Sequence, residues 1–412
     1  MEAYYHWLNS LVNQTKSEFS GLNGISWLNH YKSNGLEEKR RQLLLTFENQ
    51  MLFKDTKPFY NHLSRGCEIC GAGKWSCLFI TGKCNANCFY CPSSQLKDEP
   101  PSTQSLTFPD PRDYAAYINR IGFKGVSFSG GEPLLFFDRT LRYLEEIRRK
   151  CSPDLYIWMY TNGILADQEK LKKLARRGLN EVRFDIGATA FSLDRLKIAK
   201  NIIPAVTIEI PAIPEEKEKI IRLLPEMEKA GVKNLNLHQM RLTHHNAARL
   251  LKRKYTLLPA EKPVVVESEL TALEIMNYAK NHDINIGINY CSFFFKNRFQ
   301  QSGFRKLLGS TLVNGDRPIT ENGFIREFGN KDISYKECRI QDKNDRQDSR
   351  AIDLETRSVY FCEERLMKKS ALSDPELQTA IKLFSGEPQS IPEDPFGFRI
   401  WQMEYIESGL RM

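Results

Sequence analysis

The sequence has no apolar run long enough to span a bilayer, which takes about 20 consecutive residues. Its first seven residues, MEAYYHW, also lack the basic stretch followed by an apolar stretch that marks a secretory signal peptide. These two absences predict a cytoplasmic protein without membrane partners. Its 41% hydrophobic and 27% charged residues are ordinary for a globular protein.

A strong excess of one charge is lacking too. A net charge of +8 is modest for 412 residues, and it permits an acidic partner without requiring one. The basic run Arg249–Lys254 has no RNA-binding motif near it, so a solvated helix face explains it better and nucleic acid is not indicated. Ten cysteines in such a chain predict metal and thiol chemistry in a reducing compartment, not a disulfide framework.

Three of the cysteines, Cys84, Cys88 and Cys91, lie in one short loop after the apolar run Leu78–Thr81, which predicts a buried strand. At this spacing their thiolates can converge on one soft metal centre, an iron–sulfur cluster or zinc. A closed zinc site or an ordinary [4Fe–4S] cluster takes four protein ligands, and Pro92-Ser93-Ser94 supplies no fourth. Three ligands on a four-iron cube leave one iron free, which suggests catalysis.

The loop, including Tyr90 before its last cysteine, resembles the signature of the radical S-adenosylmethionine (SAM) superfamily. The stretch GVSFSGGEP at 125–133 is similar to that family's strand and Gly-Gly-Glu-Pro turn. The resemblance implies that the free iron binds the amino and carboxylate groups of SAM. It also implies that the turn contacts the same amino group through Gly130, Gly131, Glu132 and Pro133. A zinc knuckle beside an unrelated glycine turn is the alternative.

The implied activity is reductive cleavage of SAM to a 5′-deoxyadenosyl radical, which abstracts hydrogen from an unknown substrate. Its electrons would come from a low-potential donor such as ferredoxin or flavodoxin. Over residues 67–306 the chain is similar to a mainly archaeal subgroup described as related to pyruvate formate-lyase activating enzymes. A glycyl-radical-enzyme activase-like protein is therefore one alternative, although the chain is longer at both ends. A non-catalytic iron–sulfur or zinc protein for electron transfer or scaffolding is another.

After the cysteine loop, strand-like and helix-like segments alternate in six βα-type units, which predicts an α/β fold with a parallel sheet curved into a partial (βα)6 radical SAM barrel. The predicted strands are Leu78–Thr81, Gly125–Phe128, Leu155–Tyr160, Glu181–Ile186, Ala205–Ile210 and Asn234–His238, with a further one at Ile284–Tyr290. The predicted organisation is a helical N-terminal extension over 1–66, the barrel with a preceding cysteine-rich segment over 67–295, and an α+β extension over 296–412. We expect the last extension to end in a helix and to cover the barrel mouth or its open edge.

Polar residues at the carboxyl ends of the predicted strands are candidates for the SAM site, because chemistry in such barrels sits there. Arg183 and Asp185 lie two apart on one predicted strand and should face the same side. We expect Arg183 to bind the carboxylate of SAM, and Asp185 to bind either a ribose hydroxyl or Arg183 itself. The other candidates for cofactor binding are Tyr90, Asn162, which could equally form a turn, Glu209, which is costly to bury unpaired, and His238, the weakest.

Further cysteines suggest a second site. Cys67, Cys70 and Cys77 resemble part of a metal site, with Cys338 or Cys362 as a fourth ligand, and reduced structural thiols are an equal alternative. Cys77 and Cys84 should lie at opposite ends of a strand, more than about 13 Å apart at about 3.3 Å per residue, too far to share one cluster. Cys291 follows the last predicted strand and is a candidate catalytic hydrogen donor or cluster ligand, or an inert buried thiol.

Overall fold

The protein is described from a computed structural model, which covers residues 2–28, 35–104, 106–259, 261–312, 318–328, 333–341, 349–354, 357–362 and 390–410. One large sheet dominates these residues, with the strand order β2-β3-β14-β11-β10-β9-β8-β7-β4-β5-β6. Neighbouring strands from β4 to β14 run parallel. These parallel strands are β4 (Trp75–Thr81), β7 (Gly125–Gly130), β8 (Tyr156–Thr161), β9 (Glu181–Phe184), β10 (Ala205–Pro211), β11 (Asn234–His238) and β14 (Gly287–Cys291).

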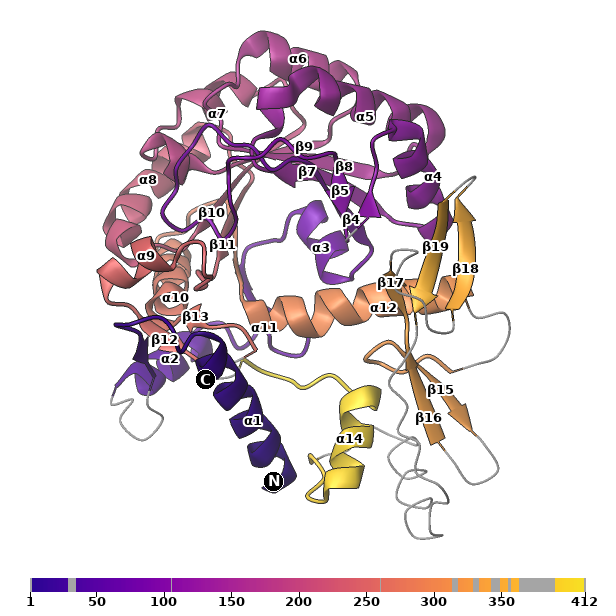
Figure 1. Ribbon diagram of the computed structural model, residues 1–412. Coiled ribbons are helices and arrows are strands. Elements are labelled where there is room, and N and C mark those ends of the chain that lie inside the picture. The colour runs from indigo at the N-terminus through magenta and orange to yellow at the C-terminus, as the bar shows by residue number, and fades with distance from the viewer. Residues whose placement is uncertain are drawn as a thin grey trace.

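Helices cover the outer face of this sheet, which curves into an open arc (Figure 1). They are α4 (Pro111–Ile121), α5 (Phe137–Lys150), α6 (Gln168–Arg176), α7 (Asp194–Ala199), α8 (Lys217–Lys229) and α10 (Val266–Asn281). Two of them begin at a capping aspartate: the Asp110 side chain accepts a hydrogen bond from Arg112 N at the start of α4, and Asp167 accepts one from Lys170 N at the start of α6. The apolar face of α5 then buries Tyr143, Leu144 and Ile147 against the sheet. The partial-barrel prediction is confirmed by this strand and helix order.

The inside of the arc is filled by a short helix, α3 (Arg65–Gly71), as Figure 1 shows. It begins at Ser64, whose hydroxyl accepts a hydrogen bond from Cys67 N. A longer helix, α12 (Gln301–Leu312), crosses the open side below α3 and contacts α4. Helix α12 also lies close to the end of α3, because a Cβ on Gly303 would lie 2.1 Å from the carbonyl oxygen of Ala72. Helix α12 belongs to the last extension predicted from the sequence, and it lies at the open edge of the arc.

The N-terminal extension is only partly helical. It contains α1 (Glu2–Glu18) and α2 (Leu36–Leu45), but also β1 (Ser26–Trp27), β2 (Met51–Leu52) and β3 (Lys57–Tyr60). Strand β3 pairs antiparallel with β14 and so extends the main sheet. Its first residue, Lys57, is buried and donates to Asn289 Oδ1 at 2.7 Å. The main sheet therefore begins near residue 51, before the expected boundary at residue 66, and that boundary stays a prediction.

Beyond α12 the described residues include small sheets and a helix near residue 400. The strands are β15 (Phe324–Phe328), β16 (Ile333–Glu337), β17 (Arg339–Gln341), β18 (Ser349–Leu354) and β19 (Arg357–Cys362), and the helix is α14 (Pro395–Glu404). This helix packs against α1, where Tyr4 and Trp7 contact the ring of Phe398. The Tyr4 hydroxyl also donates to Glu407 at 2.7 Å. Within the described residues, no helix is both long and apolar enough to cross a membrane.

Candidate functional site

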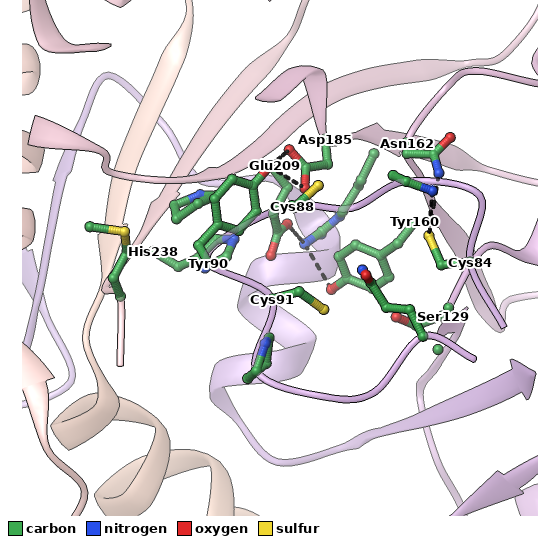
Figure 2. Close-up of a pocket in the computed structure, with 18 of the residues that line it drawn as sticks. Cys84, Cys88, Tyr90, Cys91, Ser129, Tyr160, Asn162, Asp185, Glu209 and His238 are labelled. Carbon is green, nitrogen blue, oxygen red and sulfur yellow. Dashed lines mark hydrogen bonds and ion pairs between the residues drawn. The ribbon is translucent and has the colours of Figure 1, made fainter. Parts of the chain in front are cut away.

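A cavity of about 410 Å³ opens at the carboxyl ends of the parallel strands, where barrels of this type place their chemistry. The cysteine loop after β4 forms one wall, and residues in the last part of β7, β8, β9, β10 and β11, or just after these strands and β14, form the others (Figure 2). The residues proposed from the sequence that line it are Cys84, Cys88, Tyr90, Cys91, Gly130, Gly131, Asn162, Arg183, Asp185, Glu209 and His238. The fold thus gathers side chains that are more than 150 positions apart in the sequence.

The thiols of Cys84, Cys88 and Cys91 border this one cavity (Figure 2). Burial raises the pKa of Cys84, and it raises the pKa of Cys88 to about 12. No three His, Cys, Asp or Glu side chains in the described ranges are already arranged to hold a metal ion. Three soft sulfur donors from one loop nevertheless match the ligand chemistry of an iron–sulfur cluster. The donor set therefore fits the group that the sequence suggests.

Residues just after β11 hold the outer side of the cysteine loop. The guanidinium of Arg253 lies 3.6 Å from the ring centroid of Phe89, and Arg249 donates to Asn87 Oδ1 at 2.8 Å. Asn246 Nδ2 donates to the carbonyl oxygen of Tyr90 at 3.2 Å. Sequence reasoning missed these contacts, because nothing local in a basic run distinguishes an arginine in solvent from one that packs on a distant loop.

The Gly-Gly-Glu-Pro turn is pressed against the start of the same loop. Gly131 N donates to Thr81 O at 2.7 Å, and Glu132 N donates to Lys83 O at 2.9 Å. A Cβ on Gly131 would lie 2.0 Å from Lys83 O, so only glycine fits this approach. Gly130 and Gly131 line the cavity, whereas Pro133 begins a 3₁₀ turn beneath it.

Glu132 is fully buried below the cavity and does not line it. Its carboxylate accepts hydrogen bonds from Leu134 N at 2.9 Å, Thr161 Oγ1 at 2.8 Å and Asn162 N at 2.7 Å. Burial raises the pKa of Glu132 to about 7, although these bonds favour the ionised form. Glu132 therefore ties the glycine turn to the end of β8.

Two polar residues contact the cysteine loop from the strand ends. Asn162 Nδ2 donates to Asn85 Oδ1 at 2.7 Å and lies 3.6 Å from Cys84 Sγ. Tyr90 OH donates to both carboxylate oxygens of Asp185, at 2.9 and 3.0 Å. Burial raises the pKa of Asp185 to about 6.

Arg183 was one of two partners expected for Asp185, and the structure pairs Asp185 with Tyr90 instead, whereas a ribose hydroxyl as its partner stays a prediction. Strand β9 ends at Phe184, and Asp185 begins a 3₁₀ turn at Ile186–Thr189. The two residues therefore do not share one strand face, because the alternation of a pleated strand stops before Asp185.

Arg183 is 2% exposed and lies in a network of buried charges inside the arc. Its Nε lies 2.9 Å from Glu181 Oε1, its Nη1 lies 2.7 Å from Glu209 Oε2, and its Nη2 donates to Ser64 Oγ at 3.0 Å. Asn236 adds a second donor to Glu209 at 2.9 Å. Although burial opposes ionisation, Arg183 lowers the pKa of Glu209 below its usual value. Arg183 and Glu209, two charges proposed for the SAM site, are thus partners of each other.

His238 and Cys291 are register neighbours at the carboxyl ends of β11 and β14. His238 lines the cavity, and burial, helped by the charge of Lys296, lowers its pKa to about 4. It is therefore neutral at pH 7. The expectation that the strand before Cys291 runs parallel to the others is confirmed. Cys291 itself is not among the residues that line the cavity.

The second cysteine set lies inside the arc and not at the amino end of the first strand. Cys67 and Cys70 are on α3, and Cys77 faces Ser127 and Ser129 of β7. Gln300 Nε2 lies 2.7 Å from Cys70 Sγ, and burial followed by the charge of Cys291 raises the pKa of Cys70. Two cysteines were candidates for a fourth ligand. Cys338 is buried in the apolar core, and the side chain of Cys362 lies outside the described residues. Whether these thiols bind metal stays a prediction.

Comparisons with known proteins agree with this geometry. Residues 78–234 match the model of the radical SAM superfamily. The chain is 28% identical over 309 residues to a Methanocaldococcus jannaschii protein named as a candidate glycyl-radical enzyme activating enzyme, which covers 69% of this chain and 79% of that protein. It is 32% identical over 121 residues to the GTP 3′,8-cyclase of Chlorobaculum tepidum, which covers 29% of this chain and 33% of the cyclase.

A solved structure of Streptococcus suis SuiB bound to S-adenosylmethionine matches with 14% identity and a TM-score of 0.38, over 55% of this chain and 53% of SuiB. The superfamily match spans β4 to the start of β11 and includes the cysteine loop and the glycine turn. Residues 78–234 thus match a radical SAM domain, and this match together with the archaeal relative indicates an enzyme.

Proposed function

We propose that Cys84, Cys88 and Cys91 hold a [4Fe–4S] cluster and that SAM binds beside it in the cavity. The observation that carries this proposal is that all three thiols and both glycines of the Gly130–Gly131 turn line the same cavity. Reductive cleavage of SAM at such a cluster supplies a 5′-deoxyadenosyl radical that abstracts hydrogen from a second substrate. A low-potential donor such as ferredoxin or flavodoxin would deliver the electron.

The residues of the chain divide the work of building this site. Gly130 and Gly131 let the turn approach the loop, and Glu132 fixes the turn to β8 through its three hydrogen bonds. Asn162 and Asp185 hold the loop at Asn85 and Tyr90. The loop is thus tied on several sides, which presents its three sulfurs to one space with little freedom to rearrange.

Anaerobic reconstitution with iron and sulfide tests the proposal. We expect the parent protein to show the absorbance and reduced-state electron paramagnetic resonance of a [4Fe–4S] cluster, and to form 5′-deoxyadenosine from SAM with a strong reductant. Replacing any one of Cys84, Cys88 or Cys91 by Ala should abolish 5′-deoxyadenosine formation, because the cube then keeps only two protein ligands.

Cys151→Ala is the matched control. The Cys151 thiol is half-buried 3.6 Å from the carbonyl oxygen of Ala115, does not line the cavity and should be dispensable. SAM cleavage that persists in any of the three loop variants would refute the assignment of the ligands.

A further inference from the structure

The cavity has a second wall, which the residues assigned to the cluster and to SAM leave unused. It is formed by residues that follow β11 and β14, including Gln239, Met240, Arg241, Phe293 and Lys296. Figure 2 shows His238, the last residue of β11, across the cavity from Cys84 and Asn162. This wall therefore lies on the side of the cavity away from the glycine turn.

Two cations on this wall converge on one aromatic ring. Arg241 Cζ lies 5.3 Å from the ring centroid of Phe293, and Lys296 Nζ lies 4.9 Å from the same centroid. Both side chains are half-buried, and both come from segments fixed by adjacent parallel strands. A third cation, Lys262, is close enough that burial, followed by the charges of Arg241 and Lys296, lowers its pKa.

Arg241 and Lys296 have no acidic partner in the described part of the chain, although acids lie nearby, and the charge of Glu261 acts on Lys262. Glu209 is paired with Arg183, and Asp185 accepts two hydrogen bonds from Tyr90. Glu261 accepts a hydrogen bond from Asn297 at 2.7 Å. The side chains of Arg241 and Lys296 form neither an ion pair nor a hydrogen bond with any described residue, so their charges are left uncompensated at the edge of the cavity.

We infer that Arg241 and Lys296 bind an anionic group, a carboxylate or a phosphate, of the second substrate. Two half-buried like charges repel each other and lose part of their hydration, so a bound anion would relieve both costs. The planar guanidinium of Arg241 can hold two oxygens of such a group at once, and the ammonium of Lys296 adds a third donor. Phe293 offers an apolar face to the part of the substrate next to the anion.

This inference rests on the proposed function, because it assumes that the cavity also holds a cofactor and leaves its other wall for a substrate. It does not use the cysteines or the glycine turn. It can therefore be tested on the protein without a cluster, and it fails separately from the proposed function.

The first test is isothermal titration of the cluster-free protein with inorganic phosphate and, separately, with acetate at low ionic strength. We expect saturable binding of at least one of the two, and the stronger one tells a phosphate site from a carboxylate site. The double variant R241Q/K296Q should lose affinity at least tenfold, the size of effect expected for charge-assisted hydrogen bonds. Equal anion binding by the parent and this variant, or no binding to the parent, overturns the inference.

A matched control removes two positive charges elsewhere. Arg120 and Lys172 are exposed on the outer helices α4 and α6, and R120Q/K172Q lowers the net charge by the same amount. This variant should bind phosphate or acetate like the parent. An equal loss of affinity in both double variants would mean that general electrostatic attraction binds the anion, and the inference would fall.

Equilibrium SAM binding to the reconstituted protein separates the substrate from SAM itself. If the two cations bind the substrate, the SAM dissociation constant of R241Q/K296Q should lie within about threefold of the parent's, a difference below about 1 kcal/mol. A tenfold or larger loss of SAM affinity would mean that these cations bind the carboxylate of SAM, which overturns the inference. A parent that forms no 5′-deoxyadenosine would refute the proposed function and leave the anion result unaffected.

Discussion

The buried charges around Arg183 make a quantitative prediction about stability. In Arg183→Met, the carboxylates of Glu181 and Glu209 lose the guanidinium that lies 2.9 and 2.7 Å from them. Glu181 is fully buried, so water cannot replace the lost partner. Removing one member of a buried ion pair costs about 3–5 kcal/mol, because an uncompensated charge is left behind. We expect the free energy of unfolding of the cluster-free protein to fall by about that amount.

Glu209→Gln should be milder. Arg183 keeps its contact with Glu181, and the amide oxygen of the substituted side chain can still accept the hydrogen bond from Asn236. The loss is then that of one charge-assisted hydrogen bond, about 1.5–3 kcal/mol. The double variant Arg183→Met/Glu209→Gln should lose less stability than the two single variants added together, because the Arg183–Glu209 interaction is removed in both.

Urea unfolding followed by far-ultraviolet circular dichroism measures these losses, and pH gives an internal check. In Arg183→Met the unpaired carboxylates should have raised pKa values, so the deficit in stability should shrink as the pH falls toward 5. Arg112→Met, which removes an arginine from an exposed pair with Asp110, should leave stability almost unchanged. If Arg183→Met unfolds at the parent's urea concentration at pH 7, the network does not stabilise the fold. A role for Arg183 at SAM's carboxylate, which stays a prediction, would then become the better explanation.

Two further predictions follow from the site. Arg253→Ala removes the contact with Phe89, worth about 0.5–1 kcal/mol, and an exposed ion pair with Glu215. A chelator should therefore strip iron from the reconstituted variant several-fold faster, with little change in overall stability. Parental rates in this variant and in Arg249→Ala would contradict a role in holding the loop. The pKa of His238 is lowered to about 4 from its usual 6.5, so the unfolded chain takes up the proton at a higher pH than the folded protein does. The free energy of unfolding should therefore fall as the pH drops from 6.5 to 4. The upper bound of this loss is about 3 kcal/mol, and we expect a smaller loss because the ring borders the cavity and is partly solvated. Urea unfolding at a series of pH values measures how steeply the free energy of unfolding depends on pH. His238→Gln should make this dependence weaker, and an unchanged dependence would refute the lowered pKa of His238.

The parallel strands could be predicted from the sequence because short strand-like segments alternate regularly with helix-like ones, the pattern of βα units. Strand β11 has the bounds expected from its residues, and β7, β8 and β10 differ by one or two residues. Strand β3 could not be predicted, since four residues with a lysine carry no pattern of their own. It forms because it pairs with β14, more than 220 positions later in the chain.

For the site, the carboxyl ends of the strands identified residues that line the cavity, because the geometry of a parallel barrel fixes where those ends meet. The partners of each side chain could not be read in the same way. Asp185 contacts Tyr90 because β9 stops one residue earlier, and Arg183 contacts Ser64 because α3 fills the arc. Both facts depend on where long segments pack, and neither leaves a signature at the residue itself.

The contact between α1 and α14 has a consequence for the order in which the chain acquires its structure. The hydroxyl of Tyr4 bonds to a residue 403 positions later, and its ring, with that of Trp7, packs on Phe398. While the ribosome is still adding the barrel, these aromatic rings have no such partner and are exposed to other apolar surfaces in the cell. Synthesis proceeds at about 5–20 residues per second, so this exposure lasts tens of seconds. Helix α1 is thus made long before its partner α14, and it is where we expect a nascent chain to engage a chaperone.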